Sequence, residues 1–358
     1  MDTKNNEYKI QIEELLETVF REGASDLHLS EGRHPTIRTS GMLLPLVKKG
    51  SLAHKDIEGM LLALVGEQGL RKFLQDKELD FSYQYKDLAR FRGNAFIQQG
   101  YFGVALRLIP KQIKNITELG LPAGLENFAR KKQGFFLVVG PVGQGKTTTL
   151  ASMIELINQE RSEHIVTIED PIEYVYEQKK SIIDQREVGI DTNNFESALT
   201  EALRQDVNVI LVGEMRNHET MAAAITAAET GHLVFSTLHT NSAAQTIDRI
   251  IDTFPANQQD QIRVQLASAL SGVFSQRLIP RISGGMVPAY ELLVANAAVS
   301  NLIREKRTHE INTIIETGIA DGMIDMNRCL ADLVRRGEIS IEDAYQRSLN
   351  PKVLERLL

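Results

Sequence analysis

The stretch Gly140-Pro141-Val142-Gly143-Gln144-Gly145-Lys146-Thr147 follows an apolar run, Phe135–Val139, and precedes a helix-forming run that starts at Thr148. A strand, a glycine-rich loop and a helix form the setting in which G-x-x-x-x-G-K-[ST] binds phosphate. The glycines let backbone N–H groups turn inward around phosphate oxygens, and the helix adds the positive end of its dipole. We therefore expect residues 140–148 to bind a nucleotide, with Lys146 at the β- and γ-phosphates and the Thr147 hydroxyl on Mg²⁺.

The composition of the 358 residues is that of a globular protein, with 42% hydrophobic and 24% charged residues. This length predicts two or three domains. No apolar run approaches a membrane span, and the polar start MDTKNNEYKI lacks the apolar core of a secretory signal. The single cysteine, Cys329, excludes an internal disulfide and a CxxC zinc site. We therefore expect a cytoplasmic protein without direct membrane insertion, and the net charge of -7 argues against broad binding of nucleic acid.

Residues 1–109 predict an α+β module. An amphipathic helix over Lys9–Arg21 places Ile12, Leu15, Leu16, Val19 and Phe20 on one face. The following strand alternates, which points Leu27 and Leu29 inward and Asp26 and His28 outward. His28 is better explained as a surface histidine than as a metal ligand, because no Cys or His lies nearby. Further predicted elements are helices at Asp56–Leu64 and Leu70–Gln75 and strands at Leu79–Tyr85, Arg90–Gln98 and Phe102–Ile109.

Residues 110–124 read as an interdomain linker, and the pattern then changes to strands alternating with helices over residues 125–358. This alternation predicts an α/β fold, a parallel sheet covered by helices on both faces, with ligands at the carboxyl ends of the strands. From Asn257 onward we expect mostly helix, with one strand near Val287–Val294 and a helical region from about residue 295. The predicted strands are Phe135–Val139, His164–Ile168, Val207–Val212 and Leu233–Ser236, and helices start at Thr147, Asn194 and Glu219.

One predicted strand ends in an acid, Glu214. Many P-loop proteins have at the position of Gly213 an Asp that helps to hold Mg²⁺. Without it, we expect metal coordination to rest on Thr147, phosphate oxygens and water. Glu214 is then available to orient or deprotonate the attacking water.

A second predicted strand is followed by Glu169, Asp170 and Pro171. Pro171 turns the chain away from helical geometry, so we expect both acids to be exposed. Acids beside a triphosphate suit the handling of metal or water, and we assign Glu169 to metal as well as to water. For Asp170, a nucleotide-site role and an Asx turn both remain open.

The segment Glu229–Thr240 carries a histidine at each end of an apolar strand. His239, at the carboxyl end, is placed to sense the γ-phosphate. His232, at the opposite end, has two interpretations, a nucleotide contact or a residue that stabilises the turn. Zinc binding is disfavoured because further ligands at suitable spacing are missing.

Four segments, in this order and spacing, resemble the Walker A, Asp box, Walker B and His box of the secretion-ATPase superfamily: GPVGQGKTTTLA, VTIEDPIEY, VILVGEMR and TGHLVFSTLHT. SDLHLSEG near the N-terminus, SQRLIPR at Ser275–Arg281 and AVSNLIRE at Ala298–Glu305 are similar to PilT-like type IV pilus retraction ATPases. The resemblance covers nearly the whole chain. It implies a PAS-like N-terminal domain, a RecA-like ATPase domain, a mobile linker and a homo-hexamer that uses ATP and Mg²⁺. The implied partners are an inner-membrane pilus platform protein and other pilus ATPases, at the cytoplasmic face of the inner membrane.

The resemblance also implies a role for Arg90, Arg92 and Arg107 on the last strands of the N-terminal domain. Arginines at these positions in the family face the nucleotide, partly across subunit contacts. A guanidinium delivered on domain closure neutralises charge on the γ-phosphate, worth about 10³–10⁵ in rate for arginine fingers. Solvated strand arginines are the competing interpretation.

These features together predict a hexameric, Mg²⁺-dependent ATPase that powers retraction of a type IV pilus in twitching motility. Val299 and Ser300 stand where the family usually has Ile-Arg, which keeps an accessory retraction paralogue open. A pilus-extension or type II secretion ATPase, a DNA-transport ATPase and a scaffold that binds nucleotide without hydrolysing it also stay open. The sequence leaves undecided whether Glu169 or Glu214 is the main base.

Overall fold

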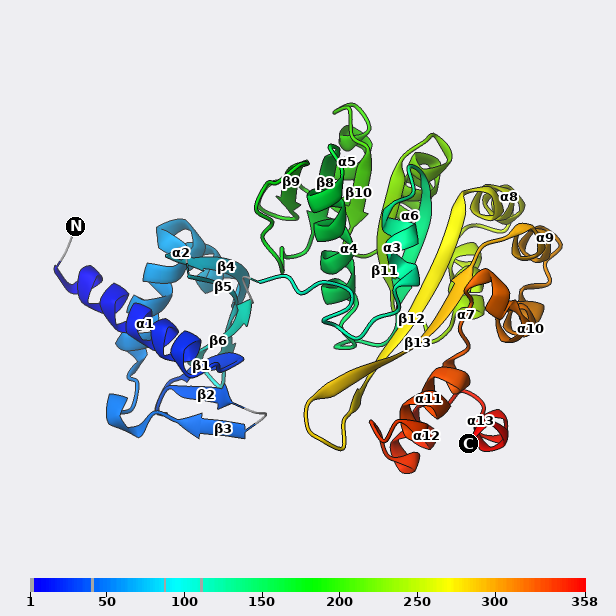
Figure 1. The fold of residues 1–358 in the computed structure, drawn as a ribbon. Helices are drawn as coiled ribbons and strands as arrows, with labels where there is room; N and C mark the ends of the chain where they lie inside the picture. Colours follow the sequence, from blue (N-terminus) through cyan, green and yellow to red (C-terminus); the bar gives the residue numbers. More distant parts are fainter. Residues whose placement is uncertain (1–2, 40–41, 87, 110–111) are drawn as a thin grey trace. The chain divides into compact units, whose positions relative to one another are not determined.

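The computed structural model describes residues 3–39, 42–86, 88–109 and 112–358, and these form two compact units (Figure 1). The first unit comprises the chain up to Gln112 together with Glu173–Val175, and the second comprises residues 113–172 and 176–358. Pro110 and Lys111, the start of the predicted linker, lie outside the described residues. Later in that segment Ile116 and Leu121 are buried, so most of it is packed chain that belongs to the second unit.

The first unit is a six-stranded antiparallel sheet with two helices packed on one face. The strand order is β3-β2-β1-β6-β5-β4. Alternation along the strands sends Leu27, Leu29, Phe91 and Leu106 into one buried cluster with the apolar faces of the helices. The elements are α1 (Thr3–Arg21), β1 (Asp26–Ser30), β2 (Thr36–Thr39), β3 (Met42–Pro45), η1 (Val47–Lys49), α2 (His54–Asp76), β4 (Glu78–Tyr85), β5 (Ala89–Gln98) and β6 (Tyr101–Ile109).

The structure differs from the sequence prediction of this unit at three points. Strands β2 and β3 were not predicted, because the short apolar run of β3 has no alternation and lies exposed at the sheet edge. The two helices predicted between residues 56 and 75 are one helix, α2, which is kinked at Gly66 with φ of 69°. Phe20, predicted on the buried face of α1, is instead 42% exposed.

The second unit is built on a seven-stranded sheet of order β13-β12-β7-β11-β10-β8-β9. All neighbouring strands pair in parallel except β12 and β13. The carboxyl ends of the parallel strands therefore meet at one edge, where the glycine-rich loop follows β7. The strands are β7 (Gly134–Val139), β8 (His164–Glu169), β9 (Ile182–Glu187), β10 (Val209–Val212), β11 (Leu233–Leu238), β12 (Leu270–Pro280) and β13 (Met286–Val294).

Helices cover both faces of this sheet (Figure 1). Phe135 and Leu137 of β7 point to one face, into a core shared with the helices from α5 to α10. Phe136 points to the other face, where its ring stacks 4.4 Å from that of Phe128 in α3, which packs beside α4. The helices up to α8 are α3 (Gly124–Ala129), α4 (Lys146–Glu160), α5 (Phe195–Ala202), α6 (His218–Glu229), α7 (Ala243–Asp252) and α8 (Gln259–Ala269).

The chain after Asn257 contains a strand that the sequence pattern did not predict. β12 continues directly from α8, and most of its residues are buried on both faces, so no alternation marks it. The outer halves of β12 and β13 pack under the last helices, around Ile279, Val287 and Leu330. These later elements are α9 (Ala297–Arg304), η2 (Thr308–Glu310), α10 (Ile311–Thr317), η3 (Gly318–Asp321), α11 (Met326–Arg335), α12 (Ile341–Arg347) and α13 (Pro351–Leu357). Among the helices described, none is long and apolar enough to cross a membrane.

Candidate functional site

The glycine-rich loop lies between β7 and α4 and has the backbone geometry that its glycines allow. Gly140, Gly143 and Gly145 have φ of 145°, 75° and 78°, in the region that side chains disfavour. Lys146 begins α4, and its ammonium group donates to the carbonyl oxygens of Gly140 and Pro141, both at 2.9 Å. The loop therefore curls around a largely buried lysine at the N-terminus of a helix, an arrangement that suits phosphate.

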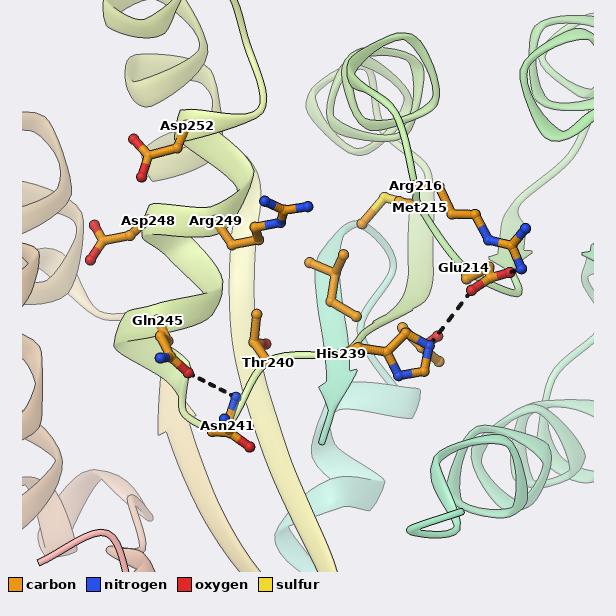
Figure 2. Close-up of a pocket in the computed structure, with 12 residues that line it drawn as sticks. Glu214, Met215, Arg216, His239, Thr240, Asn241, Gln245, Asp248, Arg249 and Asp252 are labelled. Carbon is orange, nitrogen blue, oxygen red and sulfur yellow. Dashed lines mark hydrogen bonds and ion pairs between the residues drawn. The ribbon is translucent and has the colours of Figure 1, made fainter. Parts of the chain in front are cut away.

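A chain of contacts joins this lysine to the acid at the end of β10. Lys146 Nζ lies 3.3 Å from Nδ1 of His239, and Nε2 of His239 lies 3.7 Å from Oε2 of Glu214. If Nδ1 accepts from the ammonium group, the ring proton of His239 is on Nε2, facing Glu214. Glu214 is also paired with Arg216 on its other side, as Figure 2 shows. The predicted residues Lys146, Glu214 and His239 are thus brought together.

Glu214 and His239 border a pocket of about 590 Å³ at the carboxyl ends of β10 and β11 (Figure 2). One wall is the strand-end segments with Glu214 and His239, and the other is the face of α7 with Gln245, Asp248 and Arg249. Both acids and cations line it, so the pocket suits a polar ligand.

Glu169 differs from its prediction in exposure. It ends β8 at the same sheet edge but is only 5% exposed, because its carboxylate accepts from Thr167 Oγ1 at 2.7 Å and from Gln185 Nε2 at 3.3 Å. Asp170, the next residue, is exposed as expected. The predicted pair of exposed acids is therefore one buried, hydrogen-bonded acid and one solvated acid.

His232 lies at the far end of its strand from the phosphate loop. It precedes β11, and its carbonyl accepts from Gly134 N, at the start of β7. Its Nδ1 is 2.9 Å from the Ala227 carbonyl oxygen. Six residues of strand, roughly 20 Å, separate it from the nucleotide loop. His232 is therefore too far from the phosphate loop of its own chain to contact a nucleotide there. Its contacts fit the other interpretation, a residue that stabilises the turn.

The three predicted arginines lie on β5 and β6 in the first unit. Arg92 and Arg107 are paired across the two strands and so share a sheet face. Arg107 Nε donates to Asp26 at 3.0 Å, and Arg92 lies 3.9 Å from Glu173. Arg90, two residues before Arg92, points to the same face.

Asp26 lies on the sheet face opposite Leu27, as predicted, but it is only 9% exposed because Arg107 and Arg38 cover it. Burial raises the pKa of Asp26, but hydrogen bonds from Ser25 and Arg107 outweigh it and hold that pKa below its usual value. The acid therefore stays charged and fixes the guanidinium of Arg107.

Several residues of the site have no sequence pattern that predicts their role. Arg216 pairs with Glu214, and Arg277 Nη2 lies 3.3 Å from the side-chain oxygen of Asn241, two residues after His239. Gln276 contacts the phosphate loop itself. Only the SQRLIPR resemblance pointed at Gln276 and Arg277, and it said nothing of what they contact.

The residues present fit a magnesium ion only together with a nucleotide. In the described ranges, no three His, Cys, Asp or Glu side chains come together as a metal site. A Mg²⁺ ion here would therefore need the hydroxyl of Thr147, in the first turn of α4, with phosphate oxygens and water.

Comparisons with known proteins agree with this geometry. The family model described as type II/IV secretion system protein matches residues 2–318. The chain is 44% identical to the type IV pilus retractation ATPase PilT of Pseudomonas aeruginosa, over 96% of this chain and 99% of that protein. It is also 44% identical to a twitching motility protein of Neisseria gonorrhoeae, over 88% of this chain and 84% of that one. The crystal structure of the pilus retraction motor PilT with bound ADP superposes with a TM-score of 0.91, at 46% identity, over 96% of this chain and 99% of that chain.

Proposed function

This chain belongs to the family of type II/IV secretion system proteins, and from that premise we propose that it is an ATP-hydrolysing motor that powers retraction of a type IV pilus. The resemblance to PilT-like retraction ATPases and the α/β fold class predicted from the sequence are both confirmed. The observation that carries the proposal is the contact chain from Lys146 through His239 to Glu214. It links the lysine of the phosphate loop to an acid through a histidine that a γ-phosphate would touch.

In the proposed reaction Lys146 binds the β- and γ-phosphates. The Thr147 hydroxyl would hold Mg²⁺, which would neutralise charge on the phosphates. Glu214 orients the attacking water and accepts its proton, because it lies beside His239 and its side chain is 20% exposed. Glu169 is engaged by Thr167 and Gln185, so its proposed role is to support the metal and water shell. His239 lies between Lys146 and Glu214, so its contact with the γ-phosphate would affect the position of Glu214.

We further propose that the active form is a homo-hexamer in which Arg90, Arg92 and Arg107 complete the nucleotide site, partly across subunit contacts. In support, the described first unit gathers these cations on one sheet face. Charge developing on the γ-phosphate would be neutralised only when that face closes on the nucleotide. Hydrolysis and phosphate release would then reopen the site and drive the movement.

The proposed partner is a pilus platform protein at the cytoplasmic face of the inner membrane, with other pilus ATPases acting beside it. At the variant motif in α9, Val299 is fully buried and the Ser300 hydroxyl donates to the Ala267 carbonyl oxygen at 2.8 Å. Ser300 is thus used to hold α9 on α8. An arginine whose side chain extended from this position to a partner protein could not make that contact.

Deletion of the gene in its own host tests this function, with retraction of labelled pili as the readout. We expect loss of retraction and of twitching, with recovery by the wild-type gene and no recovery by Glu214→Gln. Glu355→Gln, the same change at an exposed position of α13, is the control and should restore movement. Normal retraction in cells that lack the chain would contradict the proposal.

A further inference from the structure

Strand β12 runs alongside the phosphate loop and contacts it directly. In its pairing with β7, Ser275 is level with Val139, the last strand residue before the loop. Gln276 is therefore level with Gly140, where the loop begins. Because successive side chains of a strand point to opposite faces, Ser275 and Gln276 reach different neighbours.

Gln276 bonds the middle of the loop and the first turn of α4. Its Nε2 donates to the Gln144 carbonyl oxygen at 2.8 Å, and its Oε1 accepts from Thr149 Oγ1 at 2.6 Å. Its own carbonyl oxygen lies against Gly140, where a Cβ would come within 2.4 Å of it. The side chain is almost fully buried, so water does not replace these bonds.

The side chain of Gln144, in the loop, in turn bonds the backbone of β12. Gln144 Oε1 accepts from Leu278 N at 2.7 Å, two residues further along β12. The amide of Gln276 thus holds the backbone of Gln144, and the amide of Gln144 holds the backbone of β12. This reciprocal pair fixes the curve that presents the loop N–H groups to a phosphate.

Ser275 holds a different part of the site. Its hydroxyl donates to the Asn241 carbonyl oxygen at 3.0 Å, in the turn that follows His239. Opposite Ser275 on β13, Glu291 accepts from Ala243 N at 2.8 Å, at the start of α7. The turn that places His239 is therefore bonded to β12 and β13, on the side away from the phosphate loop.

We propose that Gln276 and Ser275 are two separate positioning residues of the nucleotide site. Gln276 sets the affinity of the phosphate loop for nucleotide, and Ser275 sets the placement of His239 and so the rate of hydrolysis. The inference rests on the proposed function in taking ATP as the substrate. It adds that neighbouring residues of one strand control binding and turnover independently.

The test compares Gln276→Leu and Ser275→Ala with the wild-type protein, with the Kd for ADP in the presence of Mg²⁺ and the kcat at saturating ATP as readouts. Gln276→Leu should raise the Kd about tenfold, the equivalent of about 1.4 kcal/mol, and change kcat less than about threefold. Ser275→Ala should lower kcat about fivefold and leave the Kd within about twofold. Gln265→Leu, the same change on a half-buried glutamine of α8 that bonds Glu229, should alter neither value.

A Gln276→Leu protein whose Kd stays at the wild-type value, or whose kcat alone falls, would overturn the inference. If that variant does not fold, Gln276→Glu replaces it, since the size is kept and the Thr149 bond can remain. Its carboxylate would repel the Gln144 carbonyl oxygen, and protonation would restore a donor, so its Kd relative to wild type should recover as the pH falls. No recovery would also count against the inference. A wild-type protein without ADP binding or turnover overturns the proposed function and this inference with it, whereas an active wild type with unaffected variants overturns the inference alone.

Discussion

Replacement of Glu291 by glutamine should remove a pH-dependent loss of stability. Glu291 lies on β13, is 4% exposed and accepts from Ala243 N, the first residue of α7. Burial raises the pKa of its carboxyl to about 7, and the nearby Asp325 adds to the rise, while the Ala243 bond and Arg277 oppose it. The native protein therefore holds the Glu291 proton up to a higher pH than the unfolded chain does.

The folded protein loses stability as the pH rises, because the unfolded chain releases the Glu291 proton at a lower pH than the folded protein does. Below a pH of about 4.5 both states are protonated, and the contribution is fully present; it is lost as the pH rises through about 7. The interval spans about 2.5 pH units, and at about 1.4 kcal/mol per unit this gives roughly 3 kcal/mol of unfolding free energy. Glutamine mimics the protonated acid and can keep the Ala243 bond. At pH 8 the Glu291→Gln protein should thus be more stable by roughly 3 kcal/mol, or roughly 6–12 °C in Tm.

Urea unfolding followed by circular dichroism from pH 5 to pH 8.5 measures this difference, and hydrogen exchange over residues 240–252 locates it. Glu355→Gln controls for the loss of one carboxylate at an exposed site. A stability difference that does not grow with pH, or a wild type more stable than Glu291→Gln at pH 8, would refute the reasoning.

Three further outcomes are expected. Glu214→Gln should lower kcat by about 10²–10⁴ with ADP binding retained, and more than Glu169→Gln does; the reverse order in a turnover assay would make Glu169 the main base. Gly140→Ala should weaken ADP binding by roughly tenfold or more, because its Cβ would meet the Gln276 carbonyl oxygen at 2.4 Å and its φ is 145°; an unchanged Kd in fluorescence titration would contradict the loop geometry. Arg107→Ala should lower kcat by about 10³ or more if it acts as an arginine finger, and a kcat within twofold of wild type would remove it from that role.

The sequence was sufficient for the parts of the fold whose residues carry a local signal. The apolar run before Gly140 and the helix after Thr147 predicted β7 and α4, and three further parallel strands were placed within a few residues. β12 was missed because a strand buried on both faces has no alternation, and here it follows α8 without a break. The domain boundaries given for residues 109 and 125 stay a prediction.

The residues of the site also differ in whether the local sequence could predict their placement. Lys146, Glu214 and His239 could be placed together because each follows a strand of one parallel sheet. The burial of Glu169 could not be predicted, since it depends on Gln185 from the neighbouring strand β9. The hydrogen bond from Gln276 to Gln144 depends on the register between β12 and β7, and the two residues are more than a hundred positions apart in the sequence. Contacts of this kind follow from tertiary pairing and leave no pattern in the local sequence.

Steady-state ATP hydrolysis by the purified chain with Mg²⁺, wild type against Lys146→Ala, tests the central claim most directly. Lys352→Ala, on the exposed surface of α13, serves as the matched control. We predict turnover by the wild type and the control, and a loss of about 10²-fold or more for Lys146→Ala, since its ammonium group is the charge that the loop encloses. A wild-type protein that hydrolyses no ATP, or a Lys146→Ala protein as active as wild type, would contradict the account.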